Sequence, residues 1–102
     1  MNHISLKGFG SVHDIAKELD IVIRDDGLKV KKVRGITRRQ GKVSIVMMVY
    51  EATMPDDKAT LSVMLTGEED TVIVDAVVTG KPHNKSIFEL IKNTLESFNF
   101  KQ

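Results

Sequence analysis

The hydrophobic pattern of the chain becomes almost continuous in the segment VSIVMMVY, residues 43–50. A strand with one face on the core and the other in water alternates apolar and polar residues. Only Ser44 and Tyr50 interrupt this run, and Tyr50 is itself largely apolar. A strand here therefore has apolar side chains on both faces, and the second face needs some form of cover.

Three consecutive strands are predicted over residues 42–54, 59–66 and 71–79, because these segments are rich in β-branched and apolar residues. Turn signals separate them, with Pro55 and two aspartates after the first strand and GEED, 67–70, after the second. Connections this short join antiparallel neighbours, so the three strands are expected to form a meander.

A fourth strand is predicted upstream over residues 28–36, joined to the next strand by the turn RRQG, 38–41. Residues 21–23 are apolar and precede Asp25, Asp26 and Gly27. This segment fits either a short fifth strand with a hairpin turn or the end of the preceding helix. The sequence leaves these two alternatives open.

Two helices are expected to bracket the strands, because both ends of the chain place apolar residues at helical spacing. These residues are Val12, Ile15, Ala16 and Leu19 in the first segment and Ile87, Phe88, Ile91, Leu95 and Phe98 in the second. Each segment begins with the spacing of a capping box, Ser11 with Asp14 and Ser86 with Glu89.

The expected fold class is therefore α+β, with the order α-β-β-β-β-α. It comprises an antiparallel meander sheet of four or five strands, with the N-terminal and C-terminal helices packed on one face. The 102 residues fit a single domain, residues 1–102.

The faces of the sheet can be assigned by residue parity along each strand. One face is then uniformly apolar and is expected to receive both helices: Val43, Ile45, Met47, Val49, Leu61, Val63, Leu65, Val72, Val74, Ala76 and Val78. The second face carries a smaller apolar set among serines, threonines and Asp75: Val46, Met48, Tyr50, Met64, Ile73 and Val77. Two helices on one face leave this second set without cover.

Three interpretations of the second face follow from this assignment. A second copy of the chain could cover it, since an apolar patch framed by Ser and Thr is typical of a homodimer interface. A small apolar ligand could bind there, or the residues could form an ordinary solvated surface. We favour the homodimer, with the six residues of the second set as its interface.

Seven basic residues gather in the segment 28–42, which contains no acid: Lys29, Lys31, Lys32, Arg34, Arg38, Arg39 and Lys42. Clustered cations are typical of anion-binding and nucleic-acid-binding surfaces. No aromatic residue lies between Gly10 and Val49 to stack on bases. Cations on both faces of a strand also fit a solvated sheet edge, where they discourage the addition of another strand. Nucleic acid is kept as an alternative partner and is not favoured.

Charge is divided unevenly along the chain, although the net charge is only +1. Residues 1–50 hold ten Lys or Arg against five Asp or Glu, whereas residues 51–102 hold five against nine. The two halves therefore carry +5 and −4, and neither value alone selects a partner.

No catalytic, cofactor or metal site is predicted from these residues. An enzyme is left open only through residues that the fold brings together. The chain has no cysteine, and no two of its three histidines are four residues apart. The two glycines before the first helix lack the rest of a dinucleotide or phosphate-loop motif. A carboxylate such as Asp75 would need a hydrogen-bond donor if its face were covered.

The expected location is the cytoplasm, because the absence of cysteine suits a reducing compartment. No stretch resembles a signal peptide or is long enough to span a membrane. The sequence favours a small non-catalytic binding or assembly module that homodimerises. Its alternatives are an anion- or nucleic-acid-binding domain and a small-molecule-binding domain with a pocket between helix and sheet lined by Met and Phe.

Overall fold

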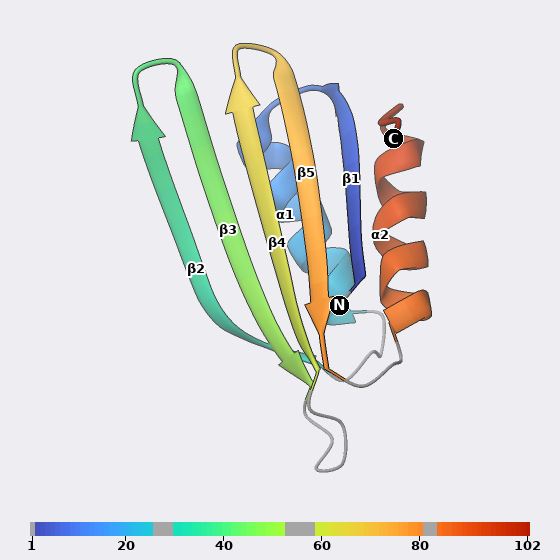
Figure 1. Ribbon diagram of the computed structural model, residues 1–102. Coiled ribbons are helices and arrows are strands. Elements are labelled where there is room, and N and C mark those ends of the chain that lie inside the picture. Colours follow the sequence, from blue (N-terminus) through green and yellow to red (C-terminus); the bar gives the residue numbers. More distant parts are fainter. Residues whose placement is uncertain (1, 26–29, 53–58, 81–83) are drawn as a thin grey trace.

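Five strands form one antiparallel sheet in the computed structural model, which describes residues 2–25, 30–52, 59–80 and 84–102 (Figure 1). The elements in chain order are β1 (Asn2–Phe9), α1 (Val12–Asp25), β2 (Val30–Gln40), β3 (Val43–Ala52), β4 (Thr60–Glu68), β5 (Thr71–Thr79) and α2 (Asn84–Ser97). The strand order across the sheet is β1-β5-β4-β3-β2.

The α+β class, the antiparallel sheet and the two helices confirm the predicted fold class. The four strands β2 to β5 form the predicted meander. The predicted element order was incomplete, because β1 precedes α1 and pairs with β5. A sequence signal for β1 exists: the polar residues His3, Ser5 and Lys7 alternate with Ile4 and Leu6.

Both helices lie on one side of the sheet (Figure 1). Helix α1 contacts β2, β3 and β4, and helix α2 contacts α1 and β1. Each helix turns a stripe of apolar residues toward the sheet, including Leu19 and Ile23 from α1 and Ile91 and Leu95 from α2, all four fully buried. The core therefore lies between the helices and one face of the sheet only.

Helix α1 starts at the predicted cap, where the Ser11 Oγ accepts a hydrogen bond from the Asp14 backbone N–H at 3.4 Å. It extends to Asp25, six residues past the predicted end at Leu19. Residues 21–23 are thus the end of the helix rather than a fifth strand, and Ile23 packs in the core. Residues 26 and 27 of the alternative hairpin turn lie outside the described residues.

Helix α2 begins at Asn84, two residues before the predicted cap at Ser86. It ends in a Schellman-type motif, in which the carbonyl of Leu95 accepts the N–H of Phe100 and the carbonyl of Glu96 accepts the N–H of Asn99, both at 3.0 Å. Asn99 takes the left-handed conformation that this motif needs, with φ of 66°. The turn sends the Phe100 ring back into the core, where it is 2% exposed.

Two glycines allow these segments to approach the sheet closely. A Cβ on Gly8 would overlap the Phe100 ring, and a Cβ on Gly67 would lie 2.8 Å from the Cβ of Val12. Gly8 thus accepts the C-terminal turn against β1, and Gly67 accepts the first turn of α1 against β4. Beyond Phe100, Lys101 exchanges two backbone hydrogen bonds with Lys7, at 2.7 and 2.9 Å, and covers part of the β1 edge.

The face assignment of β3 from parity was wrong. Val46, Met48 and Tyr50 pair with Leu65, Val63 and Leu61 of β4, so they point toward the helices and are buried. Val43, Ile45, Met47 and Val49 point to the other side. Parity could not settle this, because both alternating sets of β3 are apolar and the choice between them depends on the register with β4.

Strand β2 is an outer strand of the sheet, as the charges on both of its faces predicted. It runs to Gln40, so the turn to β3 is Gly41–Lys42 rather than the predicted 38–41. Gly41 has φ of 60°, as the first turn residue of a two-residue hairpin requires. Leu28, Lys29, the predicted turn after Pro55 and the histidine at position 83 lie outside the described residues.

Candidate functional site

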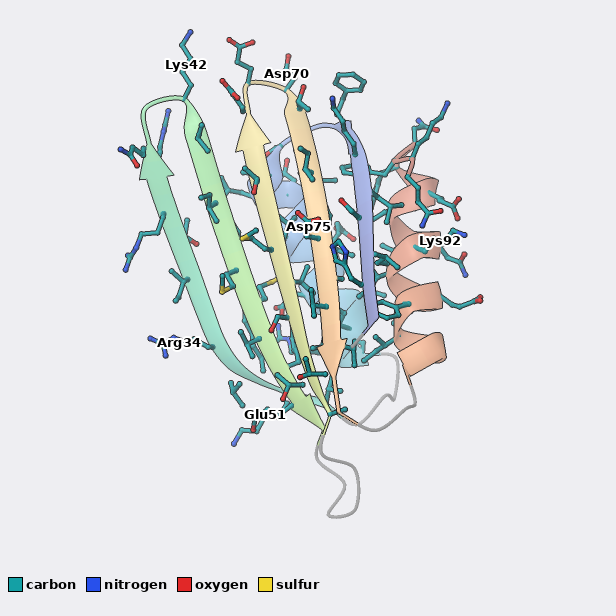
Figure 2. All side chains as sticks on the ribbon, viewed as in Figure 1. Arg34, Lys42, Glu51, Asp70, Asp75 and Lys92 are labelled. Carbon is teal, nitrogen blue, oxygen red and sulfur yellow. The ribbon has the colours of Figure 1, made fainter. Side chains whose placement is uncertain are left out.

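The side of the sheet opposite the helices is called the open face below, and it faces the viewer in Figure 2. Strand pairing aligns its side chains in four rows that cross all five strands from β2 to β1. The rows are Gln40, Val43, Glu68, Thr71, Phe9; Arg38, Ile45, Thr66, Ile73, Lys7; Ile36, Met47, Met64, Asp75, Ser5; and Arg34, Val49, Ser62, Val77, His3. The centre of the face is mainly apolar, and its two outer columns are mainly polar or basic.

The apolar side chains of the open face are partly exposed, in contrast to those of the opposite face. Met64 is 36% exposed and Ile73 is 38% exposed, whereas Val63 and Val72, their chain neighbours, are fully buried. Phe9 is 75% exposed and occupies a corner of the same face beside Thr71. Within the described chain, this face is where large apolar side chains of several strands meet water together.

Three of the six candidate interface residues lie on this face: Met64, Ile73 and Val77. The other three, Val46, Met48 and Tyr50, belong to the core and are not available to a partner. Their place on the open face is taken by Ile45, Met47 and Val49, together with Ile36 of β2. The β3 residues were assigned to the helix-covered face in the sequence because that strand's register was unknown.

Asp75 lies near the middle of the open face and is partly buried (Figure 2). Its Oδ1 is 3.2 Å from Nε2 of His3 on β1. Strand β1 was not predicted, so sequence reasoning could not name this donor. The carboxylate has a partner within its own chain, which removes the main cost of covering this face.

The basic segment is divided between the two sides of the sheet. Lys31, Arg34 and Arg38 lie on the open face, opposite Glu51, Val49 and Ile45 of β3. Lys32 points to the helix side, because the register shifts by one residue between Lys32 and Arg34. Arg39 is likewise on the helix side, and Lys42 is in the hairpin turn, 3.8 Å from Glu69. The described cations therefore do not form one continuous surface, and binding of nucleic acid stays a prediction.

A polar cluster centred on Asp20 joins α1 to the sheet. The Tyr50 hydroxyl donates a hydrogen bond of 2.5 Å to Asp20 Oδ1. Arg24, one turn along the helix, is 2.8 Å from Oδ2, and Lys32 of β2 is 3.5 Å from Oδ1. One carboxylate thus links α1, β2 and β3, and it satisfies a tyrosine hydroxyl that the packing buries completely.

Burial raises the pKa of Tyr50 far above its ordinary value of 10.0, and the hydrogen bond to the negatively charged Asp20 raises it further. The nearby Arg24 opposes the shift without reversing it. A phenol held neutral in this way donates a hydrogen bond and does not act as a base at ordinary pH. The cluster is therefore structural in character.

On the helix side, the described residues line hollows of moderate size. One, of about 360 Å³, lies between α1 and β2 and is lined by His13 and Lys17 from α1, Lys32 from β2, and Val46 and Met48 from β3. Another, of about 440 Å³, lies at the start of α1 and mixes acidic and basic residues. The first corresponds to the predicted pocket between helix and sheet lined by methionine, although no phenylalanine lines it.

Across the described residues, no three His, Asp or Glu side chains come close enough to hold a metal ion. The described residues therefore form two surfaces with distinct chemistry: the open face, apolar with basic margins, and the small groove between α1 and β2, which Lys17, Lys32 and Asp20 line.

A comparison with protein families identifies the relationship of the chain. Residues 1–98 match the model described as a family of unknown function, DUF6054. The chain belongs to this family. The match includes every helix and strand and ends just before the turn that places Phe100 in the core.

No curated protein matches the chain, and no solved structure does. Among the described residues, neither helix has the length and apolar character needed to cross a bilayer.

Proposed function

We propose that the chain is a cytoplasmic assembly module that forms a homodimer by packing the open face of one copy on that of another. The observation that carries this proposal is the apolar band of the open face, which crosses β2, β3, β4 and β5 and which neither helix of the chain contacts. Partly exposed Met64 and Ile73 lie within this band.

The dimensions of the face suit an interface. Five strands about 4.8 Å apart and nine residues of about 3.4 Å each give a footprint of roughly 600 Å². A typical specific interface uses about 800 Å² of accessible surface from each partner. Side-chain relief makes the accessible area larger than the footprint, so the two values are comparable.

The distribution of residue types also supports an interface. Stable interfaces have an apolar centre and a polar rim. Met47, Met64 and Ile73 lie toward the centre of the open face, whereas Arg34 and Lys7 lie on its outer strands. The central carboxylate, Asp75, already has His3 as a hydrogen-bond partner, so it keeps a hydrogen-bond donor when a second sheet packs on it.

The proposal is tested by measuring molar mass with light scattering after size exclusion, over a range of micromolar protein concentrations. We expect a dimer for the native chain and a folded monomer for Met64→Lys. Ile21→Lys is the matched control, because Ile21 is 40% exposed but lies on α1, away from the open face. A monomeric native chain, or a Met64→Lys variant of unchanged mass, contradicts the proposal.

A second candidate function is the binding of a small organic anion in the groove between α1 and β2. The supporting observation is that Lys17 and His13 line a hollow whose base is formed by apolar β3 residues; Lys32 also lines it, 3.5 Å from the Asp20 carboxylate. Titration with octanoate, followed by amide chemical shifts, tests it. We expect shifts confined to α1 and β2 that disappear in Lys17→Gln; no shifts, or shifts on the open face only, contradict it.

A further inference from the structure

We infer that the two sheets of the homodimer cross at a steep angle, so that the β2 arginines of each copy lie on the glutamate-bearing strand ends of the other. This inference rests on the proposed homodimer and specifies how its partner is recognised. It follows from where the strand register places charge on the open face. The two known classes of sheet packing, nearly aligned and nearly orthogonal, make different predictions from that charge pattern.

Cations occupy both outer columns of the open face. Lys31, Arg34 and Arg38 project from β2 at one margin, and Lys7 projects from β1 at the other. The same row that begins with Arg38 ends with Lys7, and the row that begins with Arg34 ends with His3.

Aligned packing places like charges together. A two-fold axis parallel to the strands and above β4 sets β2 of one copy against β1 of the other, with each row facing itself. Arg38 then faces Lys7 of the second copy. A two-fold axis perpendicular to the strands sets β2 on β2, and Arg38 faces Arg34. Like charges placed opposite each other weaken an interface and select against that arrangement.

Crossed packing removes this conflict. When the strands of the two copies run nearly at right angles, the β2 column of one copy lies near the strand ends of the other. The two faces then overlap over about 19 by 19 Å, roughly 370 Å² of footprint rather than 600 Å², so the crossed dimer has the smaller interface. An acidic residue is present on the open face at each end: Glu51 on β3, between Thr60 of β4 and Lys31 of β2, and Glu68 on β4, opposite Val43. Both are exposed. Either sense of crossing therefore brings the arginines of one copy to a glutamate of the other, twice in each symmetric dimer.

The experiment uses two double variants of the full chain, with dimer dissociation constants measured by sedimentation equilibrium and folding checked by circular dichroism. Arg34→Glu with Arg38→Glu, and separately Glu51→Arg with Glu68→Arg, should each weaken self-association by about tenfold or more. An equimolar mixture of the two should recover a dimer of native affinity, because both symmetric contacts regain opposite charges. Lys92→Glu reverses a charge on α2, away from the open face, and should dimerise as the native chain does.

The outcomes separate the two proposals. Tighter or unchanged dimerisation of Arg34→Glu with Arg38→Glu overturns the crossed geometry, because aligned packing would either bring a new glutamate to Lys7 or only replace facing arginines by facing glutamates. Failure of the mixture to recover affinity also overturns it. A native chain that is monomeric at every concentration overturns the homodimer itself, whatever the variants do.

Discussion

The two faces of the sheet carry the same kinds of apolar side chain but differ in how far these side chains are exposed to water. On the helix-covered face, Val63, Leu65 and Val74 of the central strands have almost no contact with water. On the open face, Met64 and Ile73, each next in sequence to one of the buried residues, are more than one-third exposed. The comparison teaches that side-chain type does not separate core from surface in this protein; the pairing register and the position of the helices do.

The largest contrast is expected from the same substitution on each face. Met48→Lys buries an ammonium among residues of the core, since Met48 is 3% exposed, and should lower the free energy of unfolding by about 3–5 kcal/mol. Met64→Lys should leave the stability of the subunit within about 0.5 kcal/mol of the native value. Urea unfolding of the two variants, made under conditions where both are monomeric, measures the difference. Equal losses would show that the two faces are not distinct.

A smaller effect is expected at the polar link between α1 and the covered face. Tyr50→Phe removes the hydrogen bond to Asp20 and should cost about 1.5–3 kcal/mol, the range for hydrogen bonds to charged groups. Asp20→Asn introduced together with Tyr50→Phe should cost less than it does in the native chain, because the partner hydroxyl is already gone. Strict additivity in this double-mutant cycle, measured by urea unfolding, would argue against the coupling.

Tyr50 also predicts how the stability of the chain depends on pH. The pKa of Tyr50 is raised in the folded chain, so the unfolded state loses the phenol proton first, near pH 10.0. Stability should be unaffected by this group below that pH and should fall by about 1.4 kcal/mol per pH unit above it. Tyr50 is the only tyrosine and the chain has no tryptophan, so phenolate absorbance reports this group alone. Phenolate formation in the folded chain near pH 10 would contradict the raised pKa of Tyr50. The Tyr50→Phe variant should lack the loss of stability that this phenol causes above pH 10.

Alanine substitutions at two glycines compare the packing of β4 beneath α1 with that of the outer strand β2. Gly67→Ala places a Cβ 2.8 Å from Val12 beneath α1 and should destabilise the chain by about 1–3 kcal/mol. Gly35→Ala on β2 meets only the flexible end of Lys32 at 3.2 Å and should change stability by less than about 0.5 kcal/mol. Thermal unfolding of both variants checks the order, and a more damaging Gly35→Ala would reverse our interpretation of α1 packing.

The smallest effect is expected at the turn between β4 and β5. Glu69 has φ of 55°, a conformation that costs a residue with a Cβ about 1–2 kcal/mol. Glu69→Gly should therefore stabilise the chain by about 0.5–1 kcal/mol, after the entropic cost of glycine. The ion pair lost with Lys42 joins two exposed side chains at 3.8 Å and contributes little. A lower melting temperature for Glu69→Gly would contradict this account of the turn.

Local pattern predicted most of the elements, since helix caps and strand alternation act over a few residues. It predicted the start of α1, the meander of β2 to β5 and the edge position of β2. It failed at β1, where alternation was present but the partner strand lies about 70 residues away along the chain. It also failed at Phe100, which reaches the core only because Asn99 reverses the chain after α2.

The amino-acid sequence by itself determined that this protein would be an α+β domain with more apolar strand surface than two helices can cover. Only the tertiary structure decided which residues of β3 belong to the core. Val46, Met48 and Tyr50 are no more apolar than Ile45, Met47 and Val49, so local preference does not distinguish the two sets. The pairing of β3 with β4, and the carboxylate that α1 presents to the Tyr50 hydroxyl, make that choice. Both depend on residues far apart in the chain.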